Sequence, residues 1–227
     1  MTIFALSTGS GLSGIAIIRV SGANTQKVIK KLIKQDKLPS PRLATLKKIY
    51  KINSYELIDE GLIIWFPGPN SYTGEDMAEI HIHGSRAAIK AINEEISKIH
   101  DCRMAEPGEF TKKAFQNGKI NLLKAESISD LICSETEIQR KQAIKIMSGK
   151  SSKKFNFLRE KLLKILSNIE AKIDFPEDDL PENVIKNIKI DSKIIRKEIQ
   201  KILNDQKIGE RIREGFKIAI VGPPNVG

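Results

Sequence analysis

The last residues of the sequence have the types and spacing of a phosphate-binding loop. An apolar run over residues 216–221 leads into Gly222-Pro223-Pro224-Asn225-Val226-Gly227, which fits the first six positions of the pattern G-x-x-x-x-G-K-[ST]. Glycines suit such a loop because its backbone N–H groups must turn inward to surround phosphate oxygens. A structural turn remains the alternative. The Lys that reaches the outer phosphates and the Ser or Thr that holds Mg²⁺ are absent, so we expect this chain alone not to complete the site.

Two charged residues stand in segments that are otherwise typical of buried strands. Arg19 lies in the apolar run 14–20, and Glu79 lies on the polar side of the alternating run 77–83. A charge in an apolar strand needs a partner of opposite charge or a charged ligand. For Arg19 the sequence leaves a structural ion pair and a contact with an anionic ligand equally open.

Three further residues could contribute to a site. His81 and His83 are two apart in a strand pattern, so both rings could point the same way, as in metal sites. No third ligand is evident, and we predict a role other than metal binding. Lys119 follows a glycine and precedes a long helical region; taken alone, it reads as a solvated surface lysine.

The glycine-rich stretch 9–14 is predicted to be a loop. It precedes a strand pattern, whereas a dinucleotide-binding fingerprint follows a strand and opens a helix.

The first half is predicted to mix strands and helices, which must position these residues. Its patterns predict strands at 14–20, 43–52, 57–66 and 77–83, and helices at 25–33, 85–99 and a short one ending at Phe115. Proline and glycine mark turns at 67–71 and 106–109.

The second half is predicted to be helical. Between Leu122 and Asp174 there is no proline and only one glycine, Gly149, which predicts two long antiparallel helices with a break at 149–151. An acidic turn at 175–181 is followed by a third helix, about 182–208. The change of pattern at 216–221 predicts the first strand of a further domain.

Composition narrows the class of protein. Of 227 residues, 40% are hydrophobic, and 38 basic against 28 acidic side chains give a formal charge of +10. No apolar stretch approaches the ~18 residues that a membrane span needs, so we predict a cytoplasmic protein with no membrane association. The two cysteines, Cys102 and Cys133, lie outside any zinc-binding spacing. The charge excess is +5 over 1–119 and +4 over 120–215, an even spread that suits either a solvated basic surface or RNA attraction.

Taken together, these segments resemble the tRNA-modifying GTPases of the MnmE (TrmE) family. The matching stretches run along the whole chain in order, and long ones such as that from Phe66 to Asp76 are far more specific than any short motif. They are GIAIIRVSG (14–22), FPGPNSYTGED (66–76), PGEFT (107–111), AFQNGK (114–119), AE (125–126), DLI (130–132), IDFPE (173–177) and the terminal loop 222–227.

The resemblance implies an architecture of three parts. Residues 1–119 would be an α+β domain that binds tetrahydrofolate and dimerises, with a fold like that of aminomethyltransferases. Residues 120–215 would be the first part of an all-α helical bundle domain, which the family completes after an inserted G domain. Residues 216–227 would be the first strand and partial phosphate loop of that α/β G domain.

The resemblance also implies site residues. The family's folate contacts fall on Arg19, Glu79 and Lys119, and its GTP-binding loop falls on Gly222, Asn225, Val226 and Gly227, with Asn225 helping to hold K⁺. Folate suits such a set, because its glutamate carboxylates favour cations and the N–H donors of its pterin favour a carboxylate. Catalytic residues of the GTPase are expected beyond Gly227.

The implied activity belongs to the intact protein. It would hydrolyse GTP with Mg²⁺ and K⁺ and, as a homodimer working with the flavin protein MnmG, use the one-carbon unit of 5,10-methylene-tetrahydrofolate, of which 5-formyl-tetrahydrofolate is a stable analogue. The product would be a (carboxymethyl)aminomethyl group on the wobble uridine of certain tRNAs. The alternatives are a folate-binding and dimerisation module, or a stand-alone folate-dependent aminomethyltransferase without GTPase activity.

Three positions depart from the family pattern. Ser85 stands where the family usually has Gly, and Asn121 and Lys124 stand where it usually has Asp and Gln. These departures concern the junction before the first long helix rather than the folate contacts.

Overall fold

The computed structural model describes residues 1–174, 183–204, 208–215, 219 and 221–222. The described chain divides into two compact units, Met1–Asn121 and Leu122–Gly227. The first is an α+β unit and the second is helical, which confirms the predicted fold class at this level.

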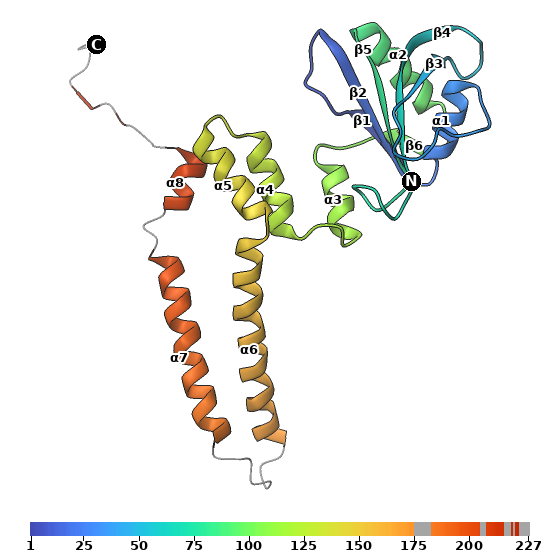
Figure 1. The fold of residues 1–227 in the computed structure, drawn as a ribbon. Helices are drawn as coiled ribbons and strands as arrows, with labels where there is room; N and C mark the ends of the chain where they lie inside the picture. Colours follow the sequence, from blue (N-terminus) through green and yellow to red (C-terminus); the bar gives the residue numbers. More distant parts are fainter. Residues whose placement is uncertain (175–182, 205–207, 216–218, 220, 223–227) are drawn as a thin grey trace. The chain divides into compact units, whose positions relative to one another are not determined.

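We call the first unit, which has an α+β fold and is distinct from the predicted G domain, the α/β unit. It is built on one six-stranded sheet with the order β3-β4-β5-β2-β1-β6 (Figure 1). All neighbouring strands are antiparallel except β1 and β6, which are parallel. The strands are β1 (Thr2–Leu6), β2 (Ser13–Ser21), β3 (Thr45–Tyr50), β4 (Leu57–Phe66), β5 (Met77–Gly84) and β6 (Cys102–Met104). The four predicted strands are confirmed, and β1 and β6 are additional to the prediction.

Three helices belong to this unit: α1 (Thr25–Ile33), α2 (Arg86–Ser97) and α3 (Glu109–Gln116). Helix α1 is amphipathic, since Val28, Ile29, Leu32 and Ile33 are buried and the positions between them are polar. Helix α2 begins where the Ser85 side chain accepts a hydrogen bond from the Ala88 N–H, as an N-cap serine does.

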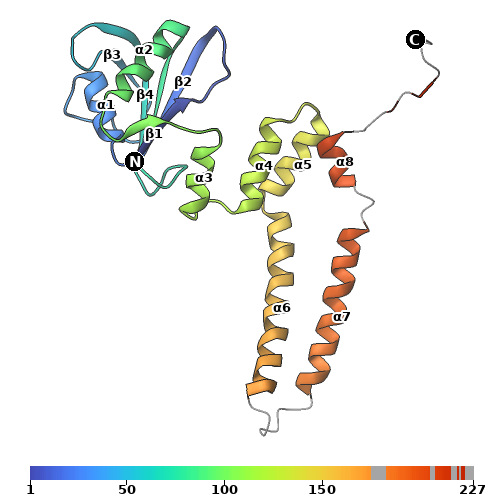
Figure 2. The same cartoon turned by 180° about the vertical axis from the view of Figure 1, so that it is seen from behind.

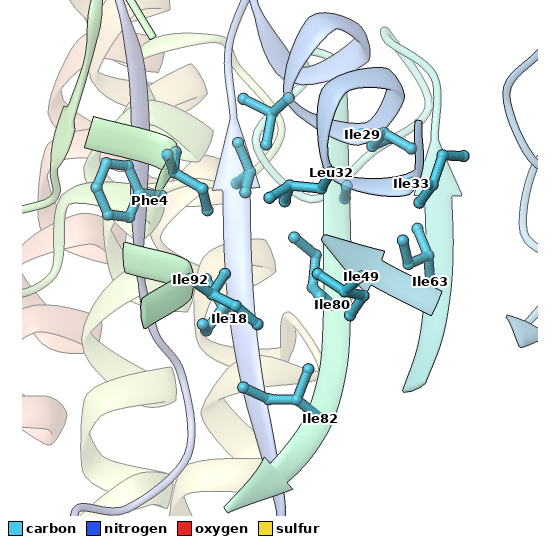
Figure 3. Packing of buried hydrophobic residues seen from close by; sticks show 14 of the residues in the cluster. Phe4, Ile18, Ile29, Leu32, Ile33, Ile49, Ile63, Ile80, Ile82 and Ile92 are labelled. Carbon is cyan, nitrogen blue, oxygen red and sulfur yellow. The ribbon is translucent and has the colours of Figure 1, made fainter. Parts of the chain in front are cut away.

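The core lies between one face of the sheet and helices α1 and α2. Ile18 of β2, Ile80 of β5 and Ile63 of β4 pack with Ile29 of α1 and Ile92 of α2, and all five are fully buried (Figure 3). Because side chains alternate along a strand, the neighbours of these residues point to the opposite face of the sheet.

The helical unit contains α4 (Leu122–Ile132), α5 (Glu137–Met147), α6 (Lys150–Asp174), α7 (Asn183–Leu203) and α8 (Ile208–Glu214). Both views show α6 and α7 as an antiparallel pair (Figures 1 and 2). Leu158, Ile165 and Ile195 are buried between them, and Lys161 pairs with Asp191 at 2.7 Å.

The first long helix predicted for this unit is wrong, because residues 122–148 form two helices. Thr136 caps α5: its hydroxyl accepts from the Gln139 N–H, and the Gln139 side chain accepts from the Thr136 N–H. This reciprocal capping box stabilises the start of a new helix at Glu137. The apolar periodicity used for the prediction shows no boundary at this position. The predicted break near Gly149 is confirmed, because α5 ends at Met147 and α6 begins at Lys150.

The third predicted helix, 182–208, corresponds to α7 alone, and α8 follows as a separate short helix. Of the strand predicted at 216–221, only Ala219 and Val221 are described. Asn225, Val226 and Gly227 lie outside the described residues, so the prediction of a nucleotide loop stays a prediction.

Candidate functional site

Arg19 and Glu79 form a cross-strand ion pair. They are directly opposite each other in the register of β2 and β5, 60 residues apart in the sequence. Their neighbours Ile18, Val20 and Ile80 are fully buried in the core, so alternation directs Arg19 and Glu79 to the opposite face of the sheet. The charged side chains in these apolar strands are therefore paired with each other.

The pair leaves part of the carboxylate accessible. Arg19 Nη2 lies 2.7 Å and Nε 3.2 Å from the same oxygen, Oε1 of Glu79. The other oxygen, Oε2, lies 3.4 Å from Nε2 of His81. The Glu79 side chain is 17% exposed and that of Arg19 is 28% exposed. A hydrogen-bond donor of a ligand can reach such a half-buried carboxylate, and an anion can reach the guanidinium.

Two aromatic rings contact the Arg19 guanidinium. Its central carbon lies 5.7 Å from the ring centroid of Tyr72 and also 5.7 Å from that of Phe110. Tyr72 belongs to the loop between β4 and β5, and Phe110 belongs to α3. Cation–π contacts of this kind hold the guanidinium in place and give the site flat apolar walls.

The loop between β4 and β5 is fastened to β2 and α3. Glu75 accepts from the Ser21 hydroxyl at 2.9 Å and pairs with Lys113 at 2.8 Å. The hydroxyls of Tyr72 and Thr111 lie 2.9 Å apart. These bonds fix the loop that supplies one wall of the site.

Lys119 borders this same loop. A Cβ atom placed on Gly74 would lie 3.3 Å from the Cγ and Cδ atoms of Lys119, and Gly74 has a φ of +80° that other residues rarely adopt. The glycine therefore lets the lysine stem lie against the loop. Among the described residues, no hydrogen bond or ion pair joins Lys119 to Arg19 or Glu79. The structure thus pairs two of the predicted residues and sets the third beside the loop that flanks them.

The start of α3 is anchored to the sheet edge. Arg103 of β6 makes a two-pronged ion pair with Glu109, with N–O distances of 2.5 and 2.8 Å. The hydrogen bonds from Arg103 hold the pKa of the Glu109 carboxyl below its ordinary value, against the opposing effect of burial. Helix α3, which carries Phe110, is therefore held at its first turn.

The two histidines of β5 both have carboxylate partners. His83 Nδ1 lies 2.8 Å from Asp59 Oδ1, and the His83 backbone N–H donates to Asp59 Oδ2. Burial by itself raises the pKa of Asp59, but the hydrogen bonds from His83 outweigh it and the pKa lies below its ordinary value. Within the described ranges, no three His, Cys, Asp or Glu side chains are placed to hold a metal ion.

Several residues of the site were missed by reasoning from motifs. They reach the site only because the loop between β4 and β5 and helix α3 both pack against β2. These residues are Tyr72, Glu75, Phe110 and Lys113. For Tyr72, Glu75 and Phe110 the one sequence signal was membership in the matching strings 66–76 and 107–111. Lys113 lies between the strings 107–111 and 114–119 and had no such signal.

Comparison with known proteins places the chain in a family. The family model for the GTP-binding protein TrmE N-terminus matches residues 2–119, and the model for the MnmE helical domain matches residues 122–217. The tRNA modification GTPase MnmE of Pelagibacter ubique is 71% identical over all 227 residues, which cover 51% of that relative. The mitochondrial tRNA modification GTPase gtpbp3 of Dictyostelium discoideum is 47% identical over the whole chain, which covers 45% of it.

The chain thus spans about half the length of the curated relatives it matches. No helix in the described part of the chain combines the length and the apolar character needed to cross a membrane.

Proposed function

Because the chain belongs to the MnmE (TrmE) family, we propose that it is the N-terminal part of a tRNA modification GTPase whose α/β unit binds a tetrahydrofolate. The contacts are Arg19, Glu79 and Lys119. The observation that carries this proposal is the partly exposed Arg19–Glu79 pair, whose guanidinium contacts two aromatic rings, with Lys119 against the adjoining loop.

The chemistry of these side chains fits a reduced folate. The pterin carries N–H groups that donate to a carboxylate, and Glu79 Oε2 accepts no hydrogen bond from Arg19. The glutamate tail carries carboxylates that suit Lys119 or Arg19. Tyr72 and Phe110 offer flat surfaces for the ring systems. When bound, the folate supplies the one-carbon unit; the residues here bind and orient it.

We assign the chain three parts: a folate-binding and dimerisation domain at 1–119, a helical domain at 120–215 and the start of a G domain at 216–227. In the intact protein, Gly222, Asn225, Val226 and Gly227 contribute to the binding of GTP, with K⁺ at Asn225 and with Mg²⁺. The intact protein is a cytoplasmic homodimer that acts with MnmG on the wobble uridine of tRNA.

The helical unit and the match to the MnmE helical domain favour this proposal over a stand-alone folate-dependent aminomethyltransferase. We expect the 227-residue chain to bind folate and to show no K⁺-stimulated release of phosphate from GTP. Phosphate release above that of a mock preparation would contradict this.

Binding of 5-formyl-tetrahydrofolate to the 227-residue chain, measured by calorimetry, tests the site. We expect Glu79→Gln to weaken binding at least tenfold, because the amide keeps the shape of the side chain but loses the charge that strengthens hydrogen bonds from the pterin. Lys119→Ala is expected to weaken binding about three- to tenfold, the loss of one exposed charge contact.

Two exposed residues serve as matched controls: Glu94→Gln for Glu79→Gln and Lys112→Ala for Lys119→Ala. Both controls should bind folate as the unchanged chain does. Equal affinity of Glu79→Gln and the unchanged chain, with equal melting temperatures, would refute the folate site.

A further inference from the structure

The positive charge of the α/β unit is concentrated in one segment. Residues 25–51 carry nine basic side chains and one acidic one, whereas the rest of 1–121 carries eight basic and eleven acidic side chains. The even spread of charge between the two halves of the chain therefore conceals a strong local excess. This segment comprises α1, β3 and the chain between them.

The fold brings these cations together around the edge of the unit that α1 and β3 form. Helix α1 packs beside β3, the edge strand of the sheet, through Ile29, Ile33 and Ile49 of the core. Lys47 of β3 donates to Gln35 Oε1, just beyond α1, at 2.8 Å. Lys47 shares the side of β3 that carries the buried Ile49, and Lys48 points to the other side of this edge strand, where both border the same hollow. We call the surface around this edge the lysine face; it consists of Lys27, Lys30, Lys31, Lys34, Lys37, Lys47 and Lys48.

Most of the lysine face has no neutralising carboxylate. In the part of the chain that the structure describes, no ion pair joins an acidic side chain to Lys27, Lys31 or Lys48, all of which are exposed. Lys51, at the border of the face, does pair with Glu56 at 2.7 Å. The lysine face is thus a cluster of like charges that an anion would stabilise.

The stability of α1 does not explain this cluster. The lysines of its last turn complement the helix dipole, but Lys27 stands in the first turn, which holds no acidic residue. Lys27 and Lys31 are also four apart on the helix, a spacing at which like charges repel. Lys27 therefore disfavours the helix in which it stands, and the stability of α1 does not account for its charge.

An exposed aromatic ring borders the lysine face. Tyr55, in the turn between β3 and β4, is 83% exposed. Its ring packs edge to face against Tyr50, with centroids 6.3 Å apart, and the Lys34 ammonium lies 5.4 Å from its centroid. These residues line a hollow of about 400 Å³, together with Lys47, Lys48 and Glu60.

We propose that the lysine face holds the RNA substrate by its phosphate backbone, and that Tyr55 stacks on an unpaired base. The inference rests on the proposed function for its choice of RNA. Lysines contact phosphates as point charges without reading sequence, and aromatic side chains stack on splayed bases in RNA loops. An acidic protein segment or an anionic membrane would also use the lysines, so the proposed function decides for RNA here and the competition experiment below separates the three.

The test measures binding of an in vitro transcribed tRNA, carrying an unmodified wobble uridine, to the 227-residue chain over a range of salt concentrations. We expect the triple variant Lys27→Glu, Lys31→Glu, Lys48→Glu to bind at least tenfold more weakly. The slope of log affinity against log salt should fall by about two to three, since each lost phosphate contact removes about 0.7 to 0.9.

A charge-matched control distinguishes a surface from net charge. Lys154→Glu, Lys164→Glu, Lys193→Glu changes three exposed lysines of α6 and α7 and should alter affinity less than threefold. Equal weakening by the two triple variants, or none by the lysine-face variant, would overturn the proposal. Unchanged Trp65 fluorescence shows that the first unit is folded, and unchanged circular dichroism at 222 nm shows that the helices of the second unit are formed.

Tyr55 provides a second readout. We expect Tyr55→Ala to weaken tRNA binding about three- to tenfold with an unchanged salt slope, and Tyr55→Phe to retain affinity. Unchanged binding by Tyr55→Ala would overturn the stacking contact.

Competition between tRNA and other anionic ligands distinguishes RNA from an acidic protein segment and from a membrane. The same measurements also distinguish a failure of this inference from a failure of the proposed function. If poly-glutamate, or vesicles with phosphatidylserine, bind the lysine face in preference to tRNA, the choice of RNA is wrong. If the unchanged chain binds no tRNA, both the lysine face as an RNA surface and the tRNA-binding role of this part of the protein fail. If the unchanged chain and the lysine-face variant bind tRNA equally, only this inference fails.

Discussion

The α/β unit encloses a large apolar core, whereas the described part of the α6–α7 pair leaves most of its apolar side chains exposed. In the α/β unit, seventeen hydrophobic residues form one buried cluster between the sheet and its two helices. Among the side chains of α6 and α7 that the structure describes, only Leu158, Ile165 and Ile195 form a buried cluster, while Leu162 and Leu203 are 50% and 72% exposed. Both regions have clear apolar periodicity. Periodicity therefore identifies the apolar side of an element but does not say what covers it.

The largest expected effect is a core truncation in the α/β unit. Ile18→Ala removes a fully buried side chain from the middle of the sheet, and we expect it to lower the free energy of unfolding by about 3 kcal/mol. Trp65, the one tryptophan of the sequence, is buried in this unit, so its fluorescence during urea unfolding reports this transition.

The matched truncation in the helical pair is Ile165→Ala. Its side chain belongs to the small cluster with Leu158 and Ile195 and is itself 9% exposed, so truncation leaves a gap open to solvent rather than a closed cavity. We expect the free energy of unfolding to fall by about 1 to 2 kcal/mol, which is the contribution of transferring the lost side-chain atoms from water alone. Circular dichroism at 222 nm measures this unfolding. If the two truncations lowered the free energy of unfolding equally, the proposed contrast between the core of the α/β unit and the α6–α7 pair would be wrong.

A buried carboxylate gives the α/β unit a pH dependence. Glu95 of α2 is 3% exposed and accepts hydrogen bonds from the Ile52 N–H and from Lys98. Burial alone raises the pKa of Glu95, but these hydrogen bonds outweigh it and the pKa lies below its usual value of 4.5. The folded state thus binds the proton less tightly than the unfolded state. The stabilisation that ionised Glu95 gives is complete above pH 4.5, and it is lost as the pH falls through the lower pKa of Glu95 in the folded state.

We therefore expect Glu95→Gln to cost about 1 to 2 kcal/mol at pH 7 and to flatten the acid side of the stability profile. The measurement is Trp65 fluorescence in urea between pH 3 and 7. An acid limb of unchanged steepness in the variant would show that another carboxyl is responsible.

The smallest expected effect tests the helix break in the second unit. Thr136→Ala removes the hydroxyl that caps α5 and should cost about 1 kcal/mol, seen by circular dichroism with Trp65 fluorescence unchanged. Thr136→Ser should retain most of the stability. A shift of both probes together would mean that the two units unfold as one.

Much of the fold follows from local patterns. The alternation of Ala78, Ile80 and Ile82 correctly predicted the core face of β5, and helical spacing correctly predicted the buried side of α1. The strands that were missed have weak local signals: β6 has three residues, and β1 is a five-residue run without the alternation that distinguishes a strand from a buried helix segment. Their pairing joins Thr2 to Cys102, a contact that no window of sequence contains.

The candidate site was predictable only in part, because several of its contacts join segments that are distant in the sequence. The sequence left Arg19 open between an ion pair and a ligand contact, and the register of β2 and β5 shows that it is paired with Glu79. The walls formed by Tyr72 and Phe110 depend on a loop and a helix meeting on β2. Tertiary contacts of this kind form between segments that are distant in the sequence, so the local spacing of residues does not reveal them.

The parallel pairing of β1 with β6 has a consequence for synthesis. The ribosome makes β1 about 100 residues before β6, and at ~5–20 residues per second the delay is about 5 to 20 s. During that time one edge of β1 has no partner strand, and an unpaired edge can pair with another chain. Helices such as α4 and α5 close their hydrogen bonds locally as they emerge. The nascent α/β unit is therefore the part of this protein that most needs protection from aggregation until residue 104 has left the ribosome.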